Sequence, residues 1–242
     1  MNIYLNSVTG IDDAIVSMFM SKRTWTRTLE EDIRSTCSKV FSKEGMLIVS
    51  PAHEDYEKIG KWMNSLVKWG WTHITMLRFI DLSVTVEGLH RAGQDDWDSH
   101  SQRFNNRIIR SSTRLADFTQ EEQLSDFYKG KVIPTDIVLK TLEVDLPEEI
   151  EIDNKVYVKS VNGYILKKEK DNKDVKRGLY MLGIPSNFIF KVNLTEFAHV
   201  YKERGIHSGA NPEVKEVAEK IADAIEDFIP WFNRELFMKI KN

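Results

Sequence analysis

Val86-Glu87-Gly88-Leu89-His90-Arg91-Ala92 joins a strand pattern to a polar stretch of the chain. Before it, the apolar residues from Ile80 to Val86 alternate with polar ones, which is typical of a half-buried strand. After it, residues 93–110 are rich in Arg, Asn, Ser and His and poor in apolar side chains. Because so many hydrogen-bonding groups adjoin a core-forming strand, we predict a functional site in this stretch.

Length and composition bound the class of protein. The chain has 242 residues, 41% hydrophobic and 29% charged, as in soluble globular proteins with one large core or two small ones. A net charge of -3 and a pI near 6.1 argue against a general nucleic-acid-binding protein and leave open a local basic pocket for a phosphate. The N-terminal residues lack the pattern of a signal peptide, and no apolar stretch could span a membrane. We therefore expect a cytoplasmic protein without nucleic-acid or membrane partners.

Regular elements follow from the spacing of apolar residues and from capping residues. Strand patterns lie at Asn2–Leu5, Ile80–Glu87 and Asn187–Val192, and Met46–Val49 fits either a buried strand or a loop. Helix patterns begin at Thr28, before Ile59, at Asn193 and at Asn211, and they end near Phe41, Gly70, Gly205 and Phe228. Without a linker or an internal repeat, the simplest interpretation is one mixed α/β domain.

The residue pattern changes between Lys129 and Lys170, where short apolar runs alternate with turn residues. The runs are Val132–Pro134, Ile137–Leu139, Glu149–Ile152, Lys155–Val158 and Tyr164–Leu166. Asp153-Asn154 and Asn162-Gly163 between the later runs favour hairpin turns. The segment is predicted to be a β-meander.

Several kinds of chemistry find little support in the sequence. Cys37 is the only cysteine, so a disulfide framework and a thiolate cluster are excluded, and a small buried residue is a commoner role for it than a nucleophile. Asp95-Asp96-Trp97-Asp98-Ser99-His100 could ligate a metal, but a solvated face is the commoner role of such a run. There is also no glycine-rich phosphate loop and no Gly-x-Ser-x-Gly elbow.

Arginines are the more informative group. Arg103, Arg107, Arg110 and Arg114 would share one face if they lay on a helix, as a solvent-facing stripe or as an anion site. Arg177 and Arg204 lie in later segments and could converge on the same anion. Spacing alone leaves both alternatives open.

The stretch from Val86 to Ala92 resembles the strand-to-helix segment of flavin-dependent thymidylate synthases (ThyX), often written hydrophobic-Glu-Gly-Val-Ser-Arg-Ala. Residues 70–79 resemble that family's Gly-His-x-Ser-Pro-Leu-Glu-His segment, and residues 99–110 its Arg-His-Arg signature and Ser-x-Arg. In the C-terminal part, Asn193, His199, Arg204 and Ala210–Val214 match family positions in order. The resemblance covers about two-thirds of the chain.

The resemblance implies an α/β (α+β) fold in which a central, largely antiparallel sheet is flanked by helices, as a single domain over residues 1–242 with the β-meander inserted at about 129–170. It implies a homotetramer that binds FAD and dUMP where subunits meet, and that uses methylenetetrahydrofolate and NADPH as co-substrates. It assigns nucleotide binding to Asn106, Arg110, Arg177 and Arg204. It assigns flavin binding to His73, Ser99, His100, Ser101, Asn193, His199 and His207. It assigns no catalytic side chain and no metal ligand.

The sequence also departs from the family pattern. Ser99 and Ser101 replace two arginines of the signature, Ile108 replaces a serine, Phe79 stands where a histidine is common, and Thr195 where an arginine is common. Two hypotheses follow. One is a divergent flavin-dependent thymidylate synthase, and the other is a relative that keeps a nucleotide pocket and has lost flavin chemistry.

Overall fold

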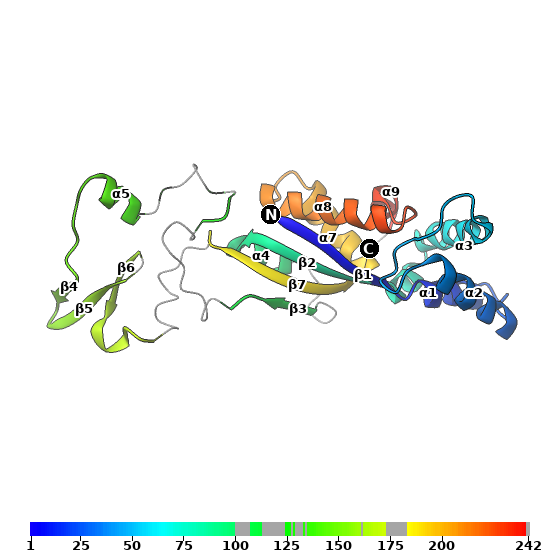
Figure 1. Cartoon of the computed structure of the whole chain (residues 1–242), viewed down its shortest axis with the longest axis horizontal. Helices are drawn as coiled ribbons and strands as arrows, with labels where there is room; N and C mark the ends of the chain where they lie inside the picture. The colour runs from blue at the N-terminus through cyan, green and yellow to red at the C-terminus, as the bar shows by residue number, and fades with distance from the viewer. Residues whose placement is uncertain are drawn as a thin grey trace. The chain divides into compact units, whose positions relative to one another are not determined.

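A four-stranded sheet in the order β1-β2-β7-β3 positions the polar stretch (Figure 1). Its strands are β1 (Asn2–Thr9), β2 (Asp81–His90), β7 (Pro185–Asn193) and β3 (Arg107–Arg110). Along β2 the side chains at 82, 84 and 86 are fully buried, so the predicted alternation is confirmed. The computed structural model describes residues 1–99, 107–112, 124–126, 128, 133, 135–160, 162–172 and 183–240. It confirms a mixed fold of helices and antiparallel sheets.

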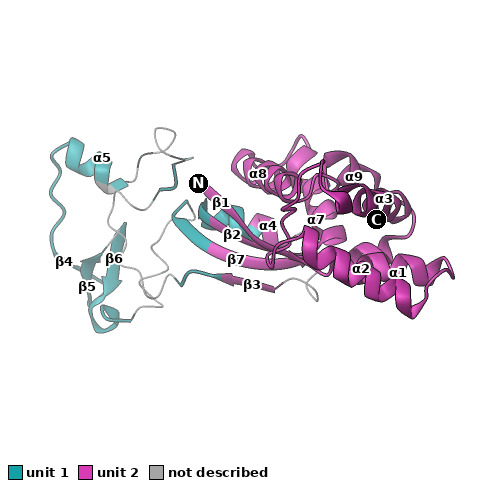
Figure 2. Ribbon diagram, turned by 45° about the vertical axis from the view of Figure 1, so that its right-hand side comes forward, with its two compact units in different colours: residues 1, 87–95, 110–187 teal, residues 2–86, 96–109, 188–242 magenta. Residues whose placement is uncertain are grey.

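The chain folds into two compact units (Figure 2). Unit 1 comprises residues 1, 87–95 and 110–187, and unit 2 comprises residues 2–86, 96–109 and 188–242. Most of the four-stranded sheet belongs to unit 2, while the β-meander belongs to unit 1. The expectation of one domain over residues 1–242 stays a prediction.

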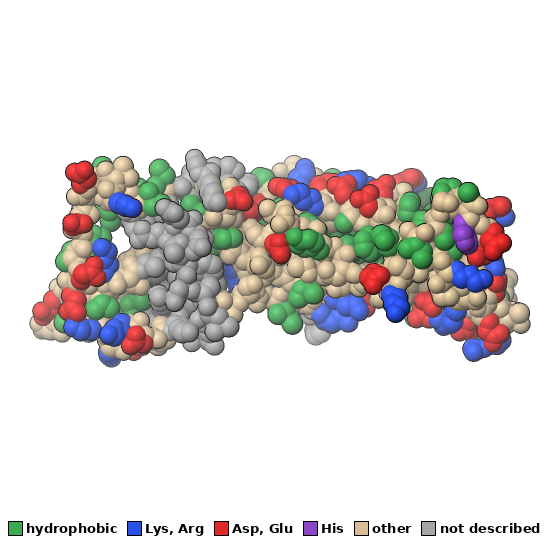
Figure 3. Space-filling view, viewed as in Figure 1, with side chains coloured by type: hydrophobic (Ala, Val, Ile, Leu, Met, Phe, Trp, Pro, Cys, Tyr) green, Lys and Arg blue, Asp and Glu red, His purple; other side chains and the backbone are tan. Residues whose placement is uncertain are grey.

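Helix α8 (Pro212–Phe228) supplies much of the core of unit 2 and contacts β1. Its apolar stripe is fully buried at Val214, Val217, Ile221 and Ile225. Asn211 caps it by accepting a hydrogen bond from the Glu213 amide at 3.0 Å, as predicted. Charged side chains lie on the outer face of α8, and apolar side chains lie over the four-stranded sheet (Figure 3).

The N-terminal part of unit 2 contains three helices and the short 3-10 turn η1 (Ile74–Phe79). They are α1 (Ile11–Ser21), α2 (Arg27–Val40) and α3 (Glu54–Gly70). The predicted start of α2 at Thr28 is wrong by two residues, because Thr26 is the cap and accepts from the Leu29 amide at 3.1 Å. Residues 46–49 form a loop with a single bridge from Leu47 to Phe41.

The helix ends predicted near Gly70 and Gly205 are confirmed, but neither glycine adopts the left-handed conformation of a helix terminator. Gly70 is the last residue of α3 and does not adopt the left-handed conformation. Instead, a Cβ at 70 would lie 2.5 Å from the Leu77 side chain, so the glycine permits close packing. Gly205 lies inside η4, a π-helical turn (Tyr201–Ile206) that continues α7 (Leu194–Val200). A Cβ there would lie 2.9 Å from the Tyr201 ring.

Unit 1 contains the antiparallel meander β4 (Glu149–Ile152), β5 (Lys155–Ser160) and β6 (Gly163–Leu166). Its turns have positive φ at Asp153, Asn154 and Asn162, as the hairpin prediction requires. Residues 137–139 were predicted as part of the meander, but they lie in helix α5 (Thr135–Thr141). A three-residue apolar run is too short to distinguish a strand from a helix.

A short 3-10 turn, η3 (Lys167–Glu169), follows β6 in unit 1. The last helix of unit 2 is α9 (Arg234–Lys239). No helix among the described residues combines the length and the apolar character needed to cross a membrane.

Cys37 is 7% exposed in α2, and burial raises the pKa of its thiol to about 12. Since the thiolate is the reactive form, we expect slow alkylation of the folded protein. Between about pH 8 and about pH 10 the folded rate should rise roughly tenfold per pH unit, while the rate in the denatured chain should level off above its ordinary pKa. Iodoacetamide labelling followed by intact-mass analysis measures both rates. Equal rates in folded and denatured protein would contradict the buried thiol.

Candidate functional site

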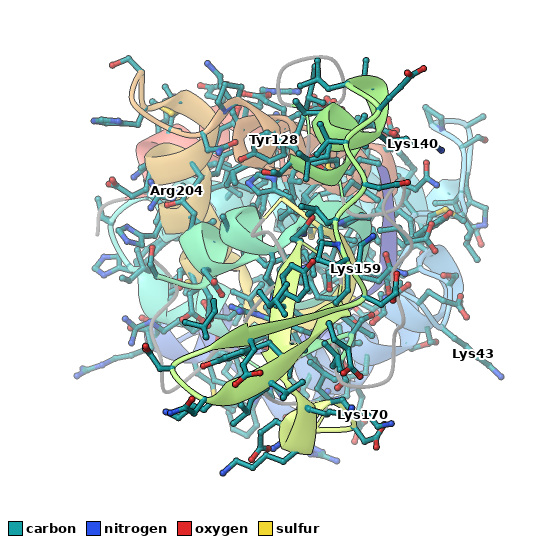
Figure 4. The ribbon with its side chains drawn as sticks, turned by 90° about the vertical axis from the view of Figure 1, so that its left-hand side faces the viewer. Lys43, Tyr128, Lys140, Lys159, Lys170 and Arg204 are labelled. Atoms are coloured by element: carbon teal, nitrogen blue, oxygen red, sulfur yellow. The ribbon has the colours of Figure 1, made fainter. Side chains whose placement is uncertain are left out.

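Arg204 projects from η4, whose π-helical geometry is frequent at functional sites (Figure 4). Its Nη2 atom lies 2.8 Å from Asp96 Oδ1 and 3.3 Å from Ser99 Oγ, and its Nε donates to the Asp96 carbonyl at 3.4 Å. Asp96 and Ser99 lie on helix α4 (Arg91–Ser99), where the Ser99 hydroxyl donates to the Asp96 carbonyl at 2.8 Å. The Arg204 side chain is 12% exposed, so its guanidinium is fixed and its charge is compensated by Asp96.

Arg110 is held in a similar way within unit 1. Its Nη1 atom pairs with Asp95, and its Nη2 donates to the Gln94 carbonyl at 3.1 Å. Gln94 is fully buried and donates to the Leu89 carbonyl at 3.1 Å, which anchors this turn of α4. With the Arg110 side chain 17% exposed, this is a second well-ordered guanidinium.

The idea that the arginines share a helix face is wrong for Arg107 and Arg110, because both lie on β3. Three residues apart on a strand, their side chains point to opposite faces. Arg107 pairs with Asp81 at 2.9 Å and is 60% exposed. The other members of the predicted stripe, Arg103 and Arg114, lie outside the described residues.

The run of carboxylates at 95–98 is more than the solvated face that the sequence favoured. Asp95 and Asp96 are the ion-pair partners of two predicted nucleotide-binding arginines. Adjacent carboxylates opposite arginines from distant segments were the signal available in the sequence. Neither spacing nor periodicity could identify the pairs.

Asn193 has a structural role that limits its use in ligand binding. Its Oδ1 atom accepts from the Glu196 amide at 3.0 Å and from the Thr195 hydroxyl at 2.6 Å, so it caps α7. The helix start predicted at Asn193 is confirmed. His199 is half-buried on the same helix.

The remaining described residues assigned to the flavin are exposed. His73 stacks on Trp69 with ring centroids 5.1 Å apart, and the His207 Nδ1 atom accepts from the Gly209 amide at 3.1 Å. Four predicted positions, His100, Ser101, Asn106 and Arg177, lie outside the described residues, and their roles stay predictions.

His90 was not among the predicted site residues. It is fully buried in unit 1, its Nε2 atom lies 3.1 Å from the Tyr128 hydroxyl, and the two rings meet edge to face at 4.8 Å. A Cβ at position 93 would lie 2.8 Å from the His90 ring, so Gly93 makes room for it. A polar side chain at the apolar end of β2 was the signal in the sequence that could have drawn attention to it.

A family profile described as thymidylate synthase complementing protein matches residues 19–231. The chain belongs to this family. Within the family fold, ThyX from Helicobacter pylori with FAD and dUMP is similar at a TM-score of 0.55 and 11% identity, covering 98% of this chain and 99% of that one. The UMP/dUMP methylase PolB from Streptomyces cacaoi bound with 5-Br dUMP is similar at 0.55 and 12%, covering 98% and 94%. No curated protein sequence matches the chain.

Proposed function

We propose that this ThyX-family protein binds dUMP and transfers a one-carbon unit from methylenetetrahydrofolate to its uracil ring, with FADH2 as reductant and NADPH restoring the flavin. Membership of the family and the likeness of the fold to FAD- and dUMP-bound ThyX support this proposal. The observation that carries it is the ordered, little-exposed guanidinium of Arg204 beside α4.

Arginine suits the nucleotide because its planar fork of donors matches phosphate and carbonyl oxygens. Arg204 in unit 2 and Arg110 in unit 1 are each oriented by a carbonyl of α4 as well as by a carboxylate. A guanidinium oriented before binding loses less entropy when the ligand arrives. The residues that we propose to bind dUMP are Arg110, Arg177, Arg204 and Asn106.

The described residues assigned to the flavin fit FAD only in part. Hydroxyl, amide and imidazole groups at Ser99, Asn193 and His199 suit the polar edge of a flavin ring or its ribityl chain. The described members of this set include no lysine or arginine for the diphosphate, and Ser99 is engaged with Arg204. Bound flavin in its reduced form would supply the reducing electrons, and this chain's own residues would orient the nucleotide and exclude water.

The position of Ser99 favours a second candidate, a nucleotide-binding relative without flavin chemistry. The Ser99 hydroxyl stands where the family pattern has an arginine, and it turns toward Asp96 and Arg204. A lost guanidinium–phosphate contact costs about 1.5–3 kcal/mol. That loss weakens flavin binding and leaves the nucleotide arginines intact.

We further propose that the protein assembles as a homotetramer in the cytoplasm. The sheet offers support, because Tyr4, Ile109 and Ile189 are 48%, 73% and 43% exposed on its strands. Exposed apolar groups of this kind mark association surfaces when they are contiguous.

Visible absorbance and calorimetry separate the two candidates. The purified protein should carry a flavin absorbance band, or gain one on reconstitution with FAD, and dUMP should shift it. A protein that stays colourless but binds dUMP by calorimetry would rule out the enzyme and support the second candidate. Absence of dUMP binding would overturn both.

Arginine variants provide the internal control for these measurements. Arg110→Ala should weaken dUMP binding about tenfold or more, as expected for a lost charge-assisted hydrogen bond. Arg107→Ala is the matched control, because Arg107 lies on the same strand, is exposed and pairs with Asp81. The control should keep the wild-type affinity.

A further inference from the structure

A cavity of about 350 Å³ in unit 2 lies between the C-terminal end of α3 and the connection from α8 to α9. Figures 1 and 2 both show α9 beside α3. Trp71, Pro230 and Trp231 form its apolar walls. None of the residues assigned to nucleotide or flavin lines it, so it is distinct from the site proposed above. Small-molecule sites usually have about 300–1,000 Å³, and this cavity is at the lower end, which suits one or two rings.

Trp231 is held firmly in the cavity wall. Its neighbours Ile229 and Phe232 are fully buried, and its ring lies 5.8 Å from that of Tyr56. A Cβ at Gly60 would lie 3.5 Å from the indole, so α3 carries its smallest residue where Trp231 packs. An aromatic ring that its protein neighbours already hold in place loses little side-chain entropy when a planar ligand stacks on it.

Trp71 is the second aromatic wall, and its indole Nε1 is shielded from solvent with no hydrogen-bond partner. Buried donors are nearly always satisfied, so an unsatisfied one in a cavity wall needs an explanation. The Lys239 Nζ atom lies 4.1 Å from the ring centroid, which fixes a cation on one face of the indole.

Polar groups complete the lining. Asn64 and Asn233 contribute amides, and Lys68 and Glu235 contribute charges of opposite sign. Asn233 Oδ1 accepts from the Leu236 amide at 3.2 Å, which leaves its NH2 group for a ligand. The side chain of Asn64 makes no hydrogen bond to any described residue and is exposed.

We propose that this aromatic cavity binds an adenine base, stacked on the tryptophans and hydrogen-bonded at its edge by asparagine amides. The Asn64 amide offers one donor and one acceptor in the plane, which complements the N6–N7 edge of adenine, and Asn233 adds a donor from its NH2 group. Stacking on an aromatic side chain stabilises binding for any base, and the two-ring adenine covers more of the tryptophan surface than uracil does, which gives the preference for adenine over a pyrimidine. A proline-rich peptide could also pack on the tryptophans, and it therefore serves as a competing probe in the experiment below.

Indole N–H signals in a ¹⁵N–¹H spectrum test the proposal with adenosine as the probe. The chain has six tryptophans, and a Trp71→Phe variant identifies the Trp71 signal by its disappearance. Adenosine should shift that signal saturably, uridine and dUMP should need concentrations at least about fivefold higher for the same shift, and a polyproline peptide should leave the signal unmoved. Equal or tighter binding of uridine or dUMP, or a shift by the peptide alone, would overturn the adenine assignment, as would the absence of any saturable shift with adenosine.

Two asparagine variants make the test specific. Asn64→Ala should raise the dissociation constant for adenosine about fivefold, as expected for one lost hydrogen bond. Asn6→Ala is the matched control, because Asn6 is also exposed and its amide donates to the Thr85 hydroxyl at 2.9 Å. Equal affinity in the two variants would overturn the role of the amide. Binding of dUMP should be unchanged in both, so failure here is distinguishable from failure of the proposed function.

Discussion

Gly10→Ala should destabilise the protein by about 3–5 kcal/mol, a large fraction of the 5–15 kcal/mol typical of a domain. Gly10 precedes α1 with φ +83°, a left-handed conformation that costs an L-residue about 1–2 kcal/mol. An added Cβ would also lie 2.0 Å from the Phe79 carbonyl oxygen. Because that oxygen belongs to the backbone, relief requires the main chain to move. Urea unfolding followed by tryptophan fluorescence measures the change.

Two further variants assign this loss to its cause. Gly209→Ala is the control, since position 209 has no positive φ and its nearest neighbour would be the His207 ring at 3.4 Å. It should change stability by no more than about 0.5 kcal/mol. Gly10→Asn tolerates the left-handed conformation better but keeps the clash. If Gly10→Asn has wild-type stability, the close approach to Phe79 is not the cause.

The elements that the sequence predicted correctly are those whose pattern repeats several times. β2 and α8 each bury a continuous stripe, so their periodicity reports the core directly. The helix ends near Gly70 and Gly205 were predicted correctly but the role of the two glycines was not, because their decisive contacts are with the side chains of Leu77 and Tyr201. Packing against a neighbouring turn leaves no trace in local capping patterns.

The sequence predicted which types of residue form the candidate site, but it could not predict which arginine pairs with which aspartate. Arg204 was assigned from the family pattern, yet its hydrogen bond to the Asp96 carbonyl joins residues 108 positions apart. A carboxylate run such as Asp95–Asp98 has the same pattern whether it faces water or an arginine. Only the fold distinguishes these cases, because it brings η4 to α4.

Arg204→Ala should lower the affinity for dUMP by about 10- to 100-fold if the proposed nucleotide role is correct, since a charge-assisted contact stabilises binding by about 1.5–3 kcal/mol. The guanidinium makes contacts only with α4 in the described structure, namely with Asp96 and Ser99. Its loss should therefore affect binding more than folding. Calorimetric titration with dUMP measures the affinity, and unfolding in urea serves as the folding control.

Asp96→Asn should have the opposite effect and tighten dUMP binding about three- to tenfold at low salt. The replacement removes a negative charge that lies 2.8 Å from the Arg204 guanidinium. It thereby also removes the repulsion between the Asp96 carboxylate and the nucleotide phosphate. Arg204 keeps its orientation, because its Nε still donates to the backbone carbonyl of residue 96 and its Nη2 to Ser99. The gain should shrink as salt rises, since screening weakens the charge effect. Weaker binding by Asp96→Asn at every salt concentration would instead show that the carboxylate is needed to position Arg204.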